Sequence, residues 1–118
     1  MRYLCLVYQD ESGMKTAPKP EMDKMIAEYA AFSTSIKESG HHIASHGLQP
    51  TSAATTVRVR QGKVSTTDGP FAETKEQLGG FFLIEAKDLN DALQVAARIP
   101  SAKIGSIEVR PIWVTAAR

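Results

Sequence analysis

The spacing of apolar residues in the first third of the chain predicts a strand, a loop and a helix. Residues 2–9 (RYLCLVYQ) are apolar with hardly any polar alternation, which predicts a strand buried on both faces. The polar residues 10–13 and the prolines at 18 and 20 predict a loop. A helix is expected over 21–39, because apolar residues recur there at spacings of three and four. Its stripe comprises Met22, Met25, Ile26, Tyr29, Ala30, Ser33 and Ile36.

The middle of the chain changes to a period of two, which is typical of strands. Residues 41–47 (HHIASHG) predict a short second strand. Residues 55–60 (TTVRVR) alternate cleanly and predict a hairpin that returns over 64–67 across 61–63. Val57 and Val59 lie on one face of this hairpin, and Arg58 and Arg60 lie on the other. The two arginines either face water or bind an anionic ligand.

The last third predicts a strand, a helix and an edge strand. Residues 80–86 (GFFLIEA) form the third apolar run. Asp88 is suited to be the N-cap of a helix whose predicted stripe is Leu89, Ala92, Leu93 and Ala96. The final strand is expected over 107–114. Pro111 cannot donate to a strand ladder, so this strand should lie at an edge or end its pairing there.

This order of elements predicts a single α+β domain over 1–118. It is the ferredoxin-like β-α-β-β-α-β sandwich with an inserted β-hairpin. A pair of helices can cover one face of such a sheet, yet the first strand has apolar residues on both of its faces. The uncovered face therefore needs a partner, and the simplest partner is a second copy related by two-fold symmetry. We expect a homodimer with sheets packed face to face.

Composition and charge exclude several classes of partner. Lys and Arg number 14 and Asp and Glu 13, so the formal net charge of +1 offers no basic excess for nucleic acid. No apolar run approaches the roughly 18 residues of a membrane span, and the start lacks a secretory signal pattern, so a cytoplasmic location is expected. The one cysteine, Cys5, lies in an apolar run and is expected to be a buried thiol.

The segment 68–81 (DGPFAETKEQLGGF) concentrates turn residues and charges, which are poor core material. Asp68 before Gly-Pro can close an Asx-type turn by accepting hydrogen bonds from following N–H groups. Alternatively, it is a carboxylate at the mouth of a pocket that acts as a base or orients a ligand. Glu73 and Lys75 are either a solvated cluster or part of a ligand site, and Phe71 is either a loop anchor or a stacking platform.

The DGPF tetrapeptide, its continuation AETKEQLGGFFLIEAKDLNDAL and the later GSIEVRPI resemble the DGPF branch of the YCII-related proteins. The resemblance extends over nearly the whole chain. It implies a dimeric α+β barrel of ferredoxin-like subunits. DGPF-branch members occur beside or fused to sigma-factor-like proteins, and YCII-branch members look like small-molecule enzymes or binders that pair a histidine at a helix start with the aspartate at the Asp68 position.

The sequence departs from that pair, because the helix start at residues 20–25 (PEMDKM) contains no histidine. His46 is the candidate that can substitute as proton acceptor beside Asp68. Tyr8 and Trp113 lie near strand ends and either line a cavity or pack in the core or dimer. His42 and His46 are about 13 Å apart along a straight strand, which is too far for one metal ion. We therefore expect no metal and no cofactor.

Two functions remain from the sequence. The first is a small-molecule binder or a proton-transfer enzyme, with a pocket between sheet and helices and Asp68, Glu73 and Lys75 at its mouth. The second is a protein-interaction module linked to sigma-factor-associated regulation. A closed pocket with a convergent carboxylate favours the first, and an exposed apolar patch left over after dimerisation favours the second.

Overall fold

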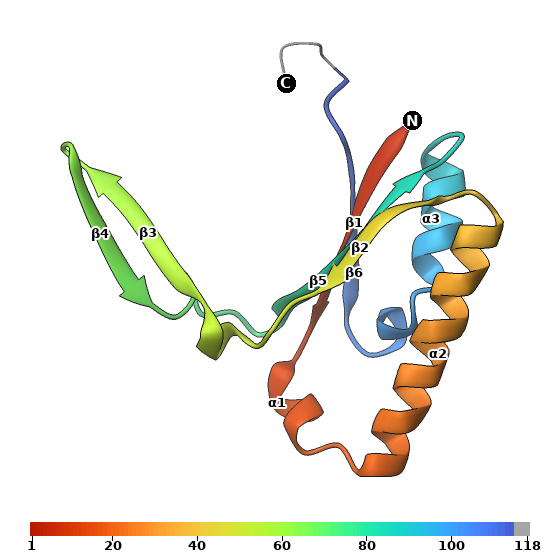
Figure 1. The fold of residues 1–118 in the computed structure, drawn as a ribbon, viewed down its shortest axis with the longest axis horizontal. Helices are drawn as coiled ribbons and strands as arrows, with labels where there is room; N and C mark the ends of the chain where they lie inside the picture. The colour runs from red at the N-terminus through yellow and green to blue at the C-terminus, as the bar shows by residue number, and fades with distance from the viewer. Residues whose placement is uncertain (115–118) are drawn as a thin grey trace.

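The computed structural model describes residues 1–114 and shows a mixed α+β fold with antiparallel sheets (Figure 1). The elements follow the chain in the order β1 (Arg2–Gln9), α1 (Glu11–Lys15), α2 (Lys19–Glu38), β2 (His42–Gly47), η1 (Thr51–Ala53), β3 (Thr55–Arg60), β4 (Lys63–Asp68), β5 (Gln77–Glu85), α3 (Leu89–Ala97), η2 (Pro100–Lys103) and β6 (Ser106–Pro111). In the described part of the chain, no helix is both long and apolar enough to cross a membrane.

The main sheet has four strands in the order β2-β5-β1-β6, and every neighbouring pair is antiparallel. The two central strands are β1 and β5, which are also the most apolar. In the outer strand β6, Pro111 lies opposite Tyr3 at the end of the ladder. The prediction that this proline marks an edge strand is therefore confirmed, because β6 needs donors toward one side only.

Helices α2 and α3 cover one face of the sheet, and the hydrophobic core lies between these helices and the sheet (Figure 1). Tyr3, Cys5 and Val7 point into this core from β1. Phe32 of α2 meets Phe82 of β5 edge to face, with ring centroids 5.1 Å apart. Burial raises the pKa of the Cys5 thiol to about 11, as expected for a structural rather than a reactive cysteine.

The faces of both helices differ in part from the predicted stripes. In α2 the buried residues are Phe32 and Ile36, whereas Ile26 is 63% exposed. In α3 the helix buries Ala92, Val95 and Ala96 and leaves Leu89 and Leu93 exposed. The Asp88 N-cap is confirmed: its carboxylate accepts from the Asp91 N–H at 2.9 Å.

The sequence predicted a loop after β1, but part of this segment is helical. Asp10 is an N-cap whose side chain accepts from the Ser12 N–H at 2.9 Å, and the short helix α1 follows. This capping bond satisfies a helix-start donor that a loop would leave to water. The expected polar loop is reduced to the few residues between α1 and α2.

The β3–β4 hairpin forms a separate two-stranded sheet that projects from the body as an arm (Figure 1). Its turn is made by Gln61 and Gly62, both at positive φ (53° and 75°), which is the type I′ geometry that matches strand twist. Lys63 already belongs to β4, so the turn is shorter than predicted. Both faces of the arm are exposed to solvent in the single chain, and Val57, Val59 and Val64 are between 56% and 70% exposed.

No helix of the described residues 1–114 covers the second face of the main sheet. Because Cys5 and Phe82 face the core, strand alternation places Leu4, Leu6, Phe81 and Leu83 on the opposite side, which we call the open face. These side chains are half-buried. The prediction that the first strand is buried on both faces therefore holds for one face of the single chain.

Candidate functional site

A cavity of about 610 Å³ lies on the helix-covered side of the sheet, beyond the end of the packed core. Its floor is formed by β1 and β5, and α1 and α2 close it from the sides. Most of its wall is apolar, with Val7, Met14, Met25, Leu48 and Phe82 contributing. The first turns of α2 extend past the sheet (Figure 1), and Met25, Tyr29 and Ser33 of this helix contribute to the cavity wall.

Helix α1 is fixed against the cavity through Glu11. The carboxylate accepts hydrogen bonds from the N–H and the hydroxyl of Thr51, each at 2.8 Å. The Glu11 N–H donates to the Gln77 side-chain oxygen at 2.9 Å. These contacts occupy the carboxylate, so Glu11 holds the wall of the cavity in place rather than offering a free base.

Further polar groups line the same cavity. The Tyr29 and Ser101 hydroxyls form a hydrogen bond across from α2 to η2, and Tyr29 stacks on Phe82 with ring centroids 6.4 Å apart. Lys15 lies at the wall and forms no ion pair with another described residue. No motif in the sequence marks Tyr29, Ser101 or Lys15 as site residues. Gln9 also lines the cavity, and its position as the polar end of an apolar strand is a signal that the sequence does contain.

Asp68 lies outside this cavity, at the end of β4 where the arm joins the body. Its side chain is exposed and accepts no hydrogen bond from a described residue. The N–H of Gly69 donates instead to the carbonyl of Ala54 at 2.7 Å, and the Thr56 hydroxyl donates to the Gly69 carbonyl at 2.9 Å. The expected Asx-type turn is therefore not formed, and main-chain bonds shape this junction.

His46 is a cavity residue, but its ring faces elsewhere. Ser45 pairs with the core-facing Phe82, so the next pair, His46 and Phe81, points to the open face. The two rings lie 5.8 Å apart. We infer that His46 contributes main chain to the cavity wall, and the structure does not bring its ring together with Asp68.

The other predicted ligand-binding residues are dispersed. Phe71 is 79% exposed, and Glu73 and Lys75 are exposed in the same loop. Hydrogen bonds from Ser12 lower the pKa of Asp10, and the charge of Lys75 adds a smaller effect, which places Lys75 near the start of α1. Tyr8 is half-buried in the sheet, opposite Leu78 and Ser106, and is not a wall residue of the cavity.

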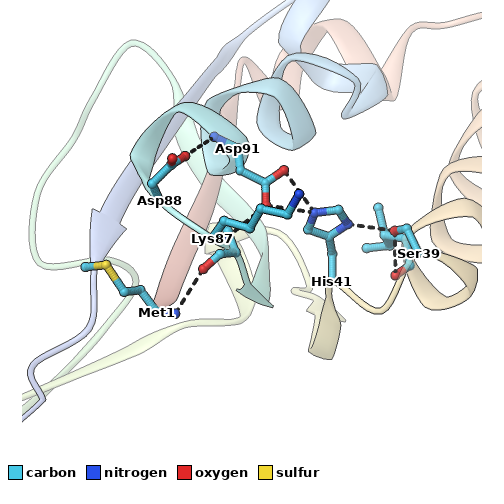
Figure 2. A network of polar contacts seen from close by, with 8 residues as sticks. Met1, Ser39, His41, Lys87, Asp88 and Asp91 are labelled. Carbon is cyan, nitrogen blue, oxygen red and sulfur yellow. Dashed lines mark hydrogen bonds and ion pairs between the residues drawn. The ribbon is translucent and has the colours of Figure 1, made fainter.

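A second polar cluster joins the end of α2 to the start of α3 (Figure 2). The two ring nitrogens of His41 bind the Ser39 hydroxyl at 2.6 Å and the Asp91 carboxylate at 3.2 Å. Hydrogen bonds from the Lys87 N–H, and then from His41, lower the pKa of Asp91. Ser39 is the C-cap of α2, and a helix C-terminus presents carbonyl groups rather than free N–H groups. A catalytic serine needs N–H donors nearby to stabilise an oxyanion. The cluster therefore resembles a catalytic triad in composition but serves to tie helices together.

The three histidines have separate partners: Asp91 for His41, Ser45 for His42 and Phe81 for His46. Within residues 1–114, no group of three His, Cys, Asp or Glu side chains is arranged to hold a metal ion.

Comparison with known proteins places the chain in a family. The YCII-related domain matches residues 1–116. An uncharacterised protein of Rhizobium meliloti (strain 1021) is 40% identical over 114 residues, which cover 95% of this chain and 92% of that protein. The chain belongs to the YCII-related family, as the DGPF motif indicated.

Proposed function

We propose that this protein binds a small, largely apolar molecule in the cavity between β1, β5, α1 and α2. The observation that carries the proposal is the cavity itself. Its volume of about 610 Å³ falls within the range of roughly 300–1,000 Å³ that is common for small-molecule sites, and its wall is mostly apolar with a few polar groups.

The charges at the wall favour a neutral or anionic ligand. Glu11 is occupied by Thr51, whereas Lys15 forms no ion pair among the described residues. A cationic ligand would meet an ammonium group without gaining a free carboxylate.

Binding of 1-anilinonaphthalene-8-sulfonate, an apolar anion, tests this site. Ser33 of α2 lines the cavity, and Ser33→Leu should fill part of it and weaken binding by about tenfold, the effect of one or two methylenes of lost fit. Thr34→Leu, on the exposed side of the same helix, is the control and should bind like wild type. The proposal would be overturned if the wild-type protein did not bind the probe. It would also be overturned if Ser33→Leu bound the probe as tightly as wild type while circular dichroism showed a native fold.

We further infer a ferredoxin-like subunit that dimerises through its open face. Support comes from the strand order β2-β5-β1-β6 with both long helices on one side. The apolar residues Leu4, Leu6, Phe81 and Leu83 lie together on the central strands of the other side. Charged Glu108 and Arg110 flank them on β6, as expected for the polar rim of an interface.

Sedimentation of Leu6→Asp and Leu83→Lys tests the dimer. Each variant should shift the protein to a monomer with unchanged secondary structure, while Val64→Lys on the arm serves as a comparison. A wild-type protein that sediments as a monomer at micromolar concentration contradicts the inference.

Proton transfer at Asp68 remains a separate proposal, with His46 as its partner. Since one chain does not join the two side chains, such chemistry needs a site completed by another subunit or by ligand-induced movement. Asp68→Asn and His46→Gln should then abolish turnover but leave cavity binding intact. Equal activity of both variants and wild type on a substrate that the cavity binds would exclude it.

The interaction-module alternative is favoured by one observation, the exposed valines of the arm. A two-stranded hairpin is marginally stable alone, so such a face gains from being covered. Hydrogen exchange of residues 55–68 should slow on addition of a sigma-factor-like protein if this function holds. An unchanged exchange rate at saturating partner would count against it.

A further inference from the structure

One amide group in the cavity wall, that of Gln9, lacks a full set of hydrogen-bond partners among the described residues. Its oxygen is buried and accepts no hydrogen bond from any described residue. Its nitrogen contacts the thioether of Met14, which is a weak acceptor. Exchanging the amide oxygen and nitrogen would leave an N–H unsatisfied instead, so the amide lacks a partner in either orientation.

Unpaired buried polar atoms are uncommon in native proteins because each loses its hydrogen bonds to water without replacement. Gln9 ends β1 and lies in the wall of the cavity, together with Met14. Other polar groups in this wall, such as Glu11 and the Tyr29–Ser101 pair, are satisfied within the protein. The Gln9 amide and the Lys15 ammonium group are thus polar groups of a largely apolar wall that lack a full partner among the described residues.

The group that contacts the amide nitrogen of Gln9 is easily moved. Met14 belongs to the short helix α1, is 37% exposed, and has a flexible unbranched side chain. Glu11 fixes the start of that helix, so the Met14 side chain can change rotamer without loss of the helix anchor. Rotation of Met14 would free the amide nitrogen for a molecule in the cavity, beside an oxygen that already lacks a partner.

We propose that the cavity ligand carries a planar edge with a hydrogen-bond donor beside an acceptor, and that Gln9 binds this edge through both amide atoms. Carboxamides, lactams and protonated carboxylic acids have such an edge. A glutamine amide matches it because its oxygen accepts and its NH₂ donates in one plane. This inference rests on the proposed function and specifies the ligand class.

Benzamide and toluene form a probe pair, because both fit the cavity and only benzamide carries the edge. Their Kd values are measured by NMR titration for wild type, for Gln9→Met, which keeps the length of the side chain, and for Gln94→Leu on exposed α3 as control. We expect Gln9→Met to shift the Kd ratio by about tenfold toward toluene, the loss expected for unpaired polar groups. Gln94→Leu should not shift it.

A second pair of measurements distinguishes recognition from a structural role. Without ligand, Gln9→Met should melt at or above the wild-type temperature, because it removes an unsatisfied buried atom. Met14→Ala should tighten benzamide binding in the Gln9 background and not in Gln9→Met. An unchanged ratio in Gln9→Met, with toluene still bound, would overturn this inference alone. Failure of both probes to bind would overturn the proposed cavity function.

Discussion

Tyr29 on α2 and Ser101 on η2 share a hydrogen bond although they lie 72 residues apart in sequence. Ser101 is 2% exposed and is the buried polar residue among the described core positions. Its hydroxyl therefore depends on Tyr29 for a partner. The bond joins the long helix to the segment before the last strand at the edge of the cavity.

Tyr29→Phe should lower the free energy of unfolding by about 1–2 kcal/mol, because it leaves the Ser101 hydroxyl buried without a partner. The change is measured by urea denaturation. Ser101→Ala and the double variant complete a double-mutant cycle. The double variant should lose less than the sum of the single changes, and additive losses would show that the two hydroxyls are not coupled.

Asp91→Asn should reduce stability in a pH-dependent way. Hydrogen bonds from Lys87 and His41 hold the folded-state pKa of Asp91 below its ordinary value of 3.8, so ionisation of this group favours folding. The contribution is fully present above that value and is lost as pH falls through the lowered pKa. The Tm difference between wild type and Asp91→Asn should thus be largest near neutral pH and shrink below about pH 4.

Glu38→Gln is the matched control for that titration, since Glu38 is exposed at the end of α2. Its Tm difference should stay small throughout. A gap for Asp91→Asn that widens in acid would mean that the carboxylate does not favour the folded state.

Gly105→Ala should destabilise the fold by about 1–3 kcal/mol, the range for overpacking. A Cβ at this position would collide with the Tyr8 carbonyl oxygen, which belongs to main chain and cannot swing away. Gly13→Ala in α1 is the control, because its added Cβ meets no atom within 4 Å beyond its chain neighbours and its own helix backbone, and alanine favours helix. Guanidinium denaturation should show loss for the first variant and no loss for the second.

Asp68→Asn should change the free energy of unfolding by less than about 0.5 kcal/mol, as for exposed positions without special contacts. The junction is held by Gly69 and Thr56 instead, so Thr56→Val should cost about 1 kcal/mol by removing the bond to the Gly69 carbonyl. Thermal melts compare the two. A larger loss for Asp68→Asn would show that the carboxylate builds the turn after all.

Local patterns were sufficient for most of the architecture. The period of two in residues 55–60 gave the hairpin, and Asp88 marked a helix start, because each depends on a few consecutive residues. Periodicity predicted less well which residues of each helix are buried. Ile26 and Leu93 fit an apolar period yet remain exposed, since burial depends on how close each helix lies to the sheet.

The sequence by itself determined the order of the strands and of the helices α2 and α3, the edge position of Pro111 and the family, through the DGPF motif. Tertiary structure alone decided the site. It separated His46 from Asp68 by turning the ring to the open face, and it left the buried amide oxygen of Gln9 without a partner in the cavity wall. Local periodicity fixes secondary structure within a few residues, whereas a cavity forms where distant segments fail to fill the space between them, and only packing determines that.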